Sequence, residues 1–325
     1  MENTISSPTN FINTINKIPR LSLGEFPTPI KKISLDNGSY FWLKDDGLSS
    51  SLYGGNKVRK LEYLLAQANQ GRAKRLIAYG DYNSHNLLAC ALFGKKLGFD
   101  LDIITFPSPD GFNDESSLAI YKKLNANIVL TKNIITASMH ALRLNKKESY
   151  LIPLGSSSVL STLGYVKAGL ELSKQIQKGI LQPPKKIYVA LGTAGTVAGL
   201  LVGLSLAEAS SQVVAVRTVE SVIANKFNLS KLVFGILKLL QLPKSFHKTV
   251  LARLECIDGN WLGKGYGHST SESQEAIELM IKKDVNLELV FTGKTMAAML
   301  NRLSEYPNGE LLFWNTHSRV KEDQS

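Results

Sequence analysis

Short apolar runs rich in β-branched residues alternate along this chain with longer segments whose apolar residues recur at helical spacing. The short runs predict strands at 39–44, 75–79, 101–106, 126–130, 186–191, 213–217 and 311–314. The longer segments predict helices that include 57–70, 84–97, 161–178, 196–209 and 272–283. Because strands that alternate with helices form parallel sheets covered on both faces, we predict a three-layer α/β architecture with mostly parallel strands.

Breaks in this pattern predict how the chain divides into domains. The loop 47–55 is rich in Ser and Gly, and Pro183-Pro184 separates a helical segment from the next strand, so both are candidate hinges. We expect 21–60 and 176–325 to form one large domain, with 61–175 as a smaller inserted α/β domain. Residues 1–20 are polar and lack the features of a signal sequence, so we expect a flexible tail there.

Composition excludes several functional classes. Hydrophobic residues make up 44% and charged residues 20% of the 325 residues, as in ordinary globular enzymes, and no apolar run is long enough to span a bilayer. The net charge of +11 comes from scattered Lys and Arg residues without interleaved aromatics, so we expect no nucleic-acid partner. Cys90 and Cys256 have no neighbour at metal-ligand or redox spacing, which favours no metal site and a reducing cytoplasm.

The segment 54–65 places a lysine behind a glycine pair at the start of an amphipathic helix. Gly54 and Gly55 allow the backbone to approach a ligand closely. The positive end of the helix lowers the proton affinity of an amine such as that of Lys57 and attracts anions. A lysine in this position can act as a nucleophile, although most Lys and Arg clusters on a helix form its solvated face.

A second candidate segment, 192–200, lies between a predicted strand and a predicted helix. Its small residues, from Gly192 to Thr196, leave backbone N–H groups pointing into one concave space where the helix dipole favours an anion. Ala194 and Val197 stand where a dinucleotide fingerprint has glycines, and a P-loop lysine is missing. The segment therefore predicts a phosphate site, with tight helix packing and a nucleotide-binding oxidoreductase as alternatives.

Polar groups also gather at three other turns. The turn Tyr79 to Asn86 follows a predicted strand, and its Ser84 is a natural helix N-cap. The segment Gly265-Tyr266-Gly267-His268 and the segment Phe291-Thr292-Gly293-Lys294 precede the last strand. Trp314-Asn315-Thr316-His317 ends that strand. Each of these turns carries groups that can hydrogen-bond a polar ligand.

Taken in order, these segments resemble the D-cysteine desulfhydrase and 1-aminocyclopropane-1-carboxylate deaminase family of fold-type-II, tryptophan-synthase-β-like enzymes. The matching strings are GGNKVRKLEYLL from Gly54, PLGSSSVLSTLGYVKAGLEL from Pro153, LGTAGTVAGL from Leu191 and LVFTGKTMAAML from Leu289. The resemblance runs from about 27 to 316. It implies two three-layer α/β/α domains with open twisted, mostly parallel sheets, a pyridoxal 5′-phosphate cofactor, a small amino-acid substrate and a homodimer.

The resemblance also implies roles for individual residues. Lys57 matches the lysine that forms a Schiff base with the cofactor, and Ser84 and Tyr266 match the other catalytic residues. The residues implied to bind the cofactor are Asn56, Lys57, Lys60, His85, Gly192, Thr193, Ala194, Gly195, Thr196 and Thr316. Those implied to bind the substrate are Asn83, Ser84 and Phe291.

Three departures from the family pattern concern the same turns. His85 stands where the family has an asparagine beside the cofactor hydroxyl, with Asn86 one place later. Phe291 replaces a second tyrosine and so lacks its hydroxyl, and His317-Ser318 replaces a glycine pair. These departures keep open a protein that binds the cofactor without catalysing a reaction.

The choice of reaction rests on two threonines. Thr292 and Thr316 resemble the desulfhydrases, whereas the ring-opening deaminases have Glu and Leu at those positions. The resemblance implies that Thr316 faces the pyridine nitrogen of the cofactor. A hydroxyl at that nitrogen makes the cofactor a milder electron sink, which suits loss of a good β-leaving group. The sequence therefore predicts α,β-elimination, with D-cysteine giving sulfide, pyruvate and ammonia. A deaminase for the cyclopropane acid or a lyase for another small amino acid is the nearest alternative.

Overall fold

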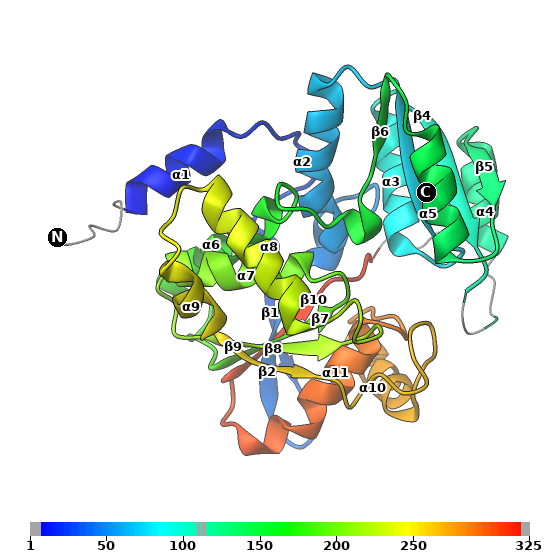
Figure 1. Cartoon of the computed structure of the whole chain (residues 1–325). Helices are drawn as coiled ribbons and strands as arrows, with labels where there is room; N and C mark the ends of the chain where they lie inside the picture. The colour runs from blue at the N-terminus through cyan, green and yellow to red at the C-terminus, as the bar shows by residue number, and fades with distance from the viewer. Residues whose placement is uncertain (1–7, 109–110, 112–114, 320–325) are drawn as a thin grey trace.

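The computed structural model describes residues 8–108, 111 and 115–319, which form two sheets with helices packed on their faces (Figure 1). The six-stranded sheet has the order β1-β2-β10-β7-β8-β9, and the four-stranded sheet has the order β5-β4-β3-β6. All strand pairs are parallel except β1 with β2. The strands are β1 (Ile30–Ser34), β2 (Tyr40–Asp45), β3 (Arg75–Asp81), β4 (Asp100–Phe106), β5 (Asn127–Leu130), β6 (Ser149–Leu151), β7 (Lys186–Leu191), β8 (Gln212–Arg217), β9 (Leu254–Asp258) and β10 (Leu311–Asn315).

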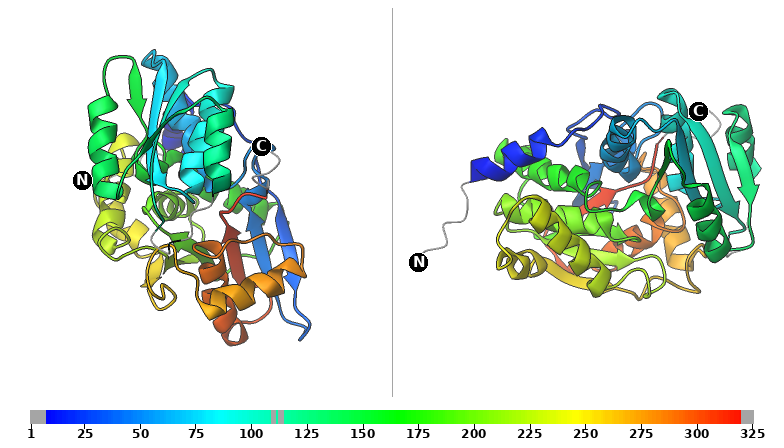
Figure 2. Two further views of the ribbon diagram at one scale, coloured as in Figure 1. Left: turned by 90° about the vertical axis from the view of Figure 1, so that its right-hand side faces the viewer. Right: turned by 45° about the horizontal axis from the view of Figure 1, so that its top comes forward.

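Helices cover both faces of the sheets, as the alternating pattern predicts (Figures 1 and 2). The α-helices are α1 (Pro8–Lys17), α2 (Asn56–Gln70), α3 (His85–Lys96), α4 (Glu115–Lys123), α5 (Ile134–Leu144), α6 (Leu163–Gln177), α7 (Gly195–Leu206), α8 (Lys226–Leu239), α9 (Phe246–Leu251), α10 (Ser271–Ile281) and α11 (Thr292–Asn301). Short 3-10 helices lie at Asp46–Leu48, Leu154–Ser156 and Leu303–Glu305. No helix of the described segments is long and apolar enough to cross a membrane.

The seven predicted strands and the five predicted helices are all present, with ends that differ from the prediction by at most three residues. Three further strands escaped the sequence pattern for physical reasons. β1 carries two lysines on an antiparallel edge of the sheet, where one side of the strand faces solvent. β6 has only three residues, and β9 is half-buried along its whole length, so neither strand shows a clear apolar alternation.

The residue ranges of the strands in the two sheets can be compared with the predicted domains. All four strands of the smaller sheet fall within 61–175, and all six strands of the larger sheet fall outside that range. Helix α6, however, packs its apolar face into the same core as α7 and the large sheet. The strand assignment thus supports an inserted domain, whereas α6 belongs with the larger unit. The boundaries themselves remain a prediction.

The segment expected to be a flexible tail contains helix α1. Its Phe11 and Ile15 are buried in the core of the larger sheet, beside α6 and Leu181. The four-residue spacing of these two apolar side chains puts them on one face of the helix. The expectation of a loose tail was therefore wrong for 8–17, because two apolar residues in a polar segment suffice to anchor a helix.

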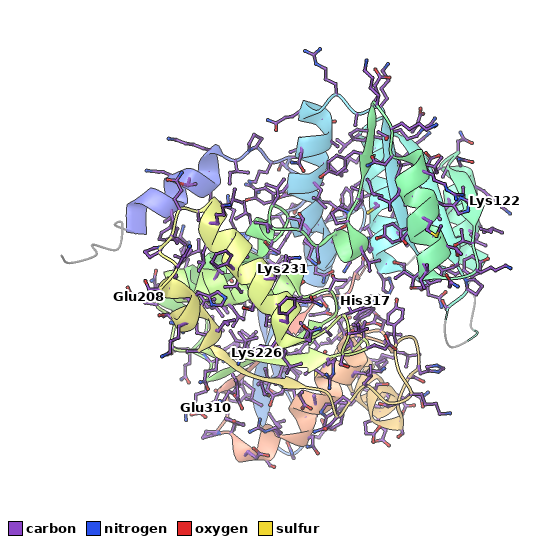
Figure 3. All side chains as sticks on the ribbon, viewed as in Figure 1. Lys122, Glu208, Lys226, Lys231, Glu310 and His317 are labelled. Atoms are coloured by element: carbon purple, nitrogen blue, oxygen red, sulfur yellow. The ribbon has the colours of Figure 1, made fainter. Side chains whose placement is uncertain are left out.

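The parallel strands direct several turns toward the space between the two sheets. β3 of the small sheet and β7 and β10 of the large sheet end at Asp81, Leu191 and Asn315, and each is followed by a turn that the sequence analysis selected. Because ligands in open parallel sheets bind beyond the carboxyl ends of the strands, this is the place to look for a site. His317 lies there, near the middle of the molecule (Figure 3).

Candidate active site

A cavity of about 360 Å³ lies between the two sheets and brings the selected turns together. Of the residues that the sequence analysis selected, it is lined by Asn56, Lys57, Lys60, Ser84, His85, Gly192, Thr193, Ala194, Gly195, Thr196, Tyr266, Phe291 and Thr316. Asn83 is not part of the described lining, although it belongs to the same turn as Ser84. The cavity has the size of a small-ligand site, with few charged groups on a mostly apolar wall.

The glycine pair before Lys57 is required by close backbone packing. A Cβ on Gly54 would lie 2.0 Å from the carbonyl oxygen of Gly47, and one on Gly55 would lie 2.6 Å from that of Thr316. Gly55 also has a φ of +86°, which side-chain-bearing residues rarely adopt. The next residue, Asn56, donates its backbone N–H to the Thr316 oxygen at 3.0 Å. The start of α2, and with it Lys57, is therefore tied to the end of β10.

A buried ion network holds the next turn of α2 in place. The Arg59 guanidinium contacts Asp46 at 2.8 Å and Glu171 of α6 at 2.9 Å. Tyr165 and Trp314 each donate a further hydrogen bond to Asp46, at 2.6 and 2.9 Å. Each charge is paired and hydrogen-bonded, which is the condition under which burial of charge is tolerated. This network fixes the helix that carries Lys57.

The environment of Lys57 makes it a better nucleophile than an exposed lysine. Burial lowers the pKa of Lys57 from 10.5 to about 8, and the nearby Cys90 and Glu288 only partly oppose this shift. Part of the side chain still reaches solvent through the cavity. A substantial fraction of the amine is therefore neutral near pH 7 and accessible to a ligand.

The loop 192–196, hereafter the Gly192 loop, leads into the first turn of α7. Ala194 has a φ of +64°, so the chain turns sharply before the helix begins. A Cβ on Gly195 would lie 2.6 Å from Ser157 Oγ, so only glycine leaves this space open. The first N–H groups of a helix have no partner within it and attract anions. The loop thus has the form expected of a phosphate site.

Lys60 and Asn56 connect α2 to the Gly192 loop. Lys60 Nζ donates to Ser157 Oγ at 3.1 Å and to the Gly155 oxygen at 3.3 Å, next to Gly195. Asn56 Nδ2 donates to Thr196 Oγ1 at 3.2 Å. Burial, together with the charge of Lys57, lowers the pKa of Lys60 well below its ordinary value. An anion on the loop would offset the repulsion between the two lysines.

The turn before α3 places Ser84 as the N-cap of that helix. Ser84 Oγ accepts the N–H of Leu87 at 3.4 Å, and a Cβ on Gly80 would lie 2.8 Å from this oxygen. Ser84 therefore has the capping role that the sequence suggested, and it also lines the cavity. The N-terminus of α3 supplies a second anion-attracting helix start in the lining of the cavity, besides the Gly192 loop. The lining thus offers two places that favour an anion, as a phosphate and a carboxylate require.

Tyr266 and Phe291 form the aromatic side of the cavity. Their rings contact edge to face with centroids 5.8 Å apart, and the Tyr266 hydroxyl donates to Asp81 Oδ2 at 2.7 Å. Phe291 Cε1 would lie 3.5 Å from a Cβ on Gly192, so its ring also packs against the Gly192 loop. Tyr266 therefore offers a hydroxyl where Phe291 offers only apolar surface.

Glu288, His85 and His317 line another part of the wall. The imidazole rings of His85 and His317 contact edge to face with centroids 4.8 Å apart, and Tyr53 Oη lies 2.7 Å from His85 Nδ1. Although burial opposes it, the two histidines hold the pKa of Glu288 below its ordinary value. Burial and His85 lower the pKa of His317, so this imidazole is neutral at pH 7. Its Nδ1 is buried without a hydrogen-bond partner among the described residues.

Sequence reasoning missed several residues of this site. Asp81, Glu288, Glu220 and Tyr53 line the cavity, and none of them was selected as a site residue. The sequence around an Asp or Glu near a turn does not show whether the carboxylate will line a cavity or lie on the solvated surface. Only Asp81 had a usable signal, because it lies within the polar turn that already contained Ser84.

Comparisons with known proteins agree with this geometry. A family model described as "Pyridoxal-phosphate dependent enzyme" matches residues 21–316. A D-cysteine desulfhydrase from Salmonella paratyphi A is 30% identical over 323 residues, which covers 94% of this chain and 95% of the relative. A solved 1-aminocyclopropane-1-carboxylate (ACC) deaminase homologue superposes with a TM-score of 0.80 at 27% identity, covering 95% and 94% of the two chains.

More distant structures share the fold. Threonine deaminase isoform 2 from Solanum lycopersicum has a TM-score of 0.66 at 15% identity, with 97% of this chain and 90% of that one covered. A hydrogen sulfide-producing enzyme from Fusobacterium nucleatum has a TM-score of 0.63 at 17% identity, with 94% and 95% covered. At this level of identity, the structural similarity supports the mostly parallel α/β fold and gives no information about the reaction.

Proposed function

Because this chain belongs to the pyridoxal-phosphate-dependent enzymes, we propose that it catalyses α,β-elimination on a small amino acid, with D-cysteine as the first substrate to test. The observation that carries this proposal is the position of Lys57. Its amine has a lowered pKa and opens into a cavity between an anion-attracting loop and a capped helix start. The 30% identity to a D-cysteine desulfhydrase supports the choice of substrate.

The residues of the cavity fit the cofactor. The Gly192 loop offers a cradle that a Cβ at Gly195 would fill, and Lys60 lies beside it to balance a phosphate charge. Among the described residues, the buried Nδ1 of His317 has no hydrogen-bond partner, and because His317 lines the same cavity, a polar ligand could satisfy this atom. We infer that Lys57 attaches the cofactor covalently and that Asn56, Lys60, His85, Thr316 and the Gly192 loop hold it.

The remaining residues act on the substrate. Bound pyridoxal phosphate supplies an electron sink for the charge left when the α-proton departs. Ser84 and the N-terminus of α3 bind the substrate carboxylate, because helix dipole and hydroxyl both favour an anion there. Lys57 Nζ, freed when the substrate amine takes its place on the cofactor, would then take the α-proton as general base. Tyr266 orients the substrate, and Phe291 supplies an apolar wall in place of a second hydroxyl. Asn83 precedes Ser84 in the same turn, where its backbone N–H donates to Asp81 Oδ1 at 3.0 Å, and we propose that it contributes to substrate binding from there.

A lysine exchange tests the cofactor assignment. We expect purified protein to show the visible absorbance of a lysine-bound cofactor, and borohydride reduction followed by peptide mapping to mark Lys57. Lys57→Ala abolishes this band and all keto-acid release. Lys60→Met is the matched control, because Lys60 lies one helical turn away on the same cavity and should weaken cofactor binding without removing attachment. Cofactor attached at Lys60 in the wild-type protein would contradict the proposal.

The ring-opening deaminase reaction is the second candidate. The structural similarity to an ACC deaminase homologue, with a TM-score of 0.80, supports it. An assay with D-cysteine, D-serine, β-chloro-D-alanine and the cyclopropane acid separates the two, since the cyclopropane acid yields 2-oxobutanoate and D-cysteine yields sulfide and pyruvate. Release of 2-oxobutanoate without sulfide would show that the protein catalyses the deaminase reaction and not the elimination of D-cysteine.

We also infer that the protein acts as a cytoplasmic homodimer. The resemblance to the family supports the dimer, and the free thiols of Cys90 and Cys256 suit a reducing compartment. Light scattering of the eluting holoprotein measures the mass directly. A mass of 35.7 kDa, that of one chain, would contradict the dimer.

A further inference from the structure

A hydrogen bond crosses the cavity between the two sheets. Asp81 is the last residue of β3 in the small sheet, and Tyr266 lies in the loop between β9 and α10 of the larger unit. The Tyr266 hydroxyl donates to Asp81 Oδ2 at 2.7 Å, and both residues line the cavity. The tyrosine that the proposed function assigns to the substrate is thus held by a carboxylate from the opposite wall.

The Asp81 carboxylate is fixed on its own side. It is 5% exposed, and its Oδ1 accepts the backbone N–H of Asn83 at 3.0 Å and the Ser108 hydroxyl at 3.3 Å. These bonds hold Oδ1, while Oδ2 accepts the Tyr266 hydroxyl. Asp81 therefore presents a preorganised acceptor to the phenol.

The Tyr266 loop is fixed on the other side. Glu220 Oε1 accepts the backbone N–H of Tyr266 at 3.0 Å, and Lys294 Nζ donates to the oxygens of Leu262 and Gly265 at 2.8 and 3.3 Å. Gly265 has a φ of +127°, which only glycine adopts readily. The backbone of the loop is therefore held where the Tyr266 hydroxyl meets Asp81.

We propose that Asp81 is a positioning residue that accepts the hydrogen bond of the Tyr266 hydroxyl, so that the phenol keeps its proton and its oxygen faces the substrate as a hydrogen-bond acceptor. This inference rests on the proposed function, because it assigns the role within the same cavity. Ionising the phenol beside a carboxylate would place two negative charges together, which disfavours Tyr266 as an acid. Tyr266 then recognises the amino group of the incoming substrate, which can donate a hydrogen bond to the phenol oxygen, and leaves proton transfer to Lys57.

The contact itself is tested without turnover. Thermal unfolding of the holoprotein is measured for Asp81→Ala, Tyr266→Phe and the double variant, together with Asp81→Asn. We expect the double variant to lose no more stability than the more damaging single one, because both remove the same bond. Ser108→Ala is the matched control, since it removes another partner of Asp81 and leaves the phenol bond in place. Additive losses would overturn the contact.

The role is tested by substrate binding. We expect Asp81→Ala to raise KM for D-cysteine about tenfold with a smaller effect on kcat, as one lost hydrogen bond does. Tyr266→Phe should do the same, the double variant should be no worse, and Asp81→Asn should recover most of the loss because its amide oxygen still accepts. Equal losses in Asp81→Asn and Asp81→Ala, or a loss confined to kcat, would overturn the positioning role.

A substrate analogue separates this inference from the proposed function. D-alanine lacks a leaving group, so its binding can be followed by the change in cofactor absorbance even if D-cysteine is not turned over. The same variants should weaken D-alanine binding in the same order. A wild-type protein that binds the cofactor and D-alanine but releases no product from D-cysteine would contradict the proposed elimination reaction. The D-alanine affinities of the variants would still test the positioning role of Asp81. If D-alanine causes no change, the thermal cycle decides whether the contact exists.

Discussion

The lowered pKa of Lys57 predicts how fast the apoprotein takes up its cofactor. Only the neutral amine attacks an aldehyde, and burial lowers the pKa of Lys57 from 10.5 to about 8. At pH 7 the neutral fraction is then roughly 10%, against roughly 0.03% for an unperturbed lysine. The difference is a factor of about 300 in reactive amine.

The assay is the rate of cofactor uptake by the apoprotein between pH 6 and pH 10, followed by visible absorbance. We expect the rate to rise about tenfold per pH unit up to about pH 8 and then to level off, because the amine is mostly neutral beyond that point. A rate that keeps rising to pH 10 would refute the argument. Glu288→Gln is the informative variant, since the Glu288 charge holds the pKa of Lys57 up and its loss should move the break to lower pH.

The same shift makes the apoprotein more stable at high pH. Between pH 8 and pH 10.5 the unfolded chain keeps a proton on Lys57 that the folded chain has released. Because the unfolded state binds more protons, stability rises with pH across this window. Below pH 8 the buried ammonium costs at most about 3 kcal/mol. Lys57→Met apoprotein should therefore resist urea better than wild type at pH 7, and the advantage should shrink by pH 10.

Two further substitutions test the scaffold around Lys57. Gly55→Ala should cost more than about 3 kcal/mol in unfolding free energy and disturb cofactor absorbance, because its Cβ meets the Thr316 oxygen at 2.6 Å. Gly38→Ala is the control, since Gly38 has a similar φ of +83° but open space around it, and equal losses would refute the steric argument. Arg59→Met should lower the unfolding free energy by about 3–5 kcal/mol, because, among the described residues, it leaves the buried Asp46 carboxylate without an ion pair and Glu171 with Lys44 alone. Arg302→Met, which breaks partly exposed ion pairs, should lower it by less than about 1 kcal/mol in the same urea titration.

Local signals in the sequence determined most of the fold. Strands such as β7 and β8 are continuous apolar runs, and helices such as α2 and α3 begin at glycine or serine signals, so short-range chemistry specifies both their type and their ends. The edge strand β1 was missed because its lysines face solvent and hide the apolar alternation, and helix α1 was misjudged because it packs against α6 and Leu181, which are distant in sequence.

The candidate site divides in the same way. Lys57, Ser84 and the Gly192 loop could be selected in advance, because each follows a strand or a glycine turn with a mechanism that can be read from neighbouring residues. Glu288 could not, and the turn that contains Asp81 did not reveal its partner, since a carboxylate acquires its role only from the groups it meets. Tyr266 follows Asp81 by 185 residues, and only the packing of two sheets brings the phenol to the carboxylate. Local sequence signals were enough to predict most strands and several helices and to select Lys57. The pKa of Lys57 and the partners of Tyr266 depend on the tertiary structure, because they follow from burial and from distances across the cavity.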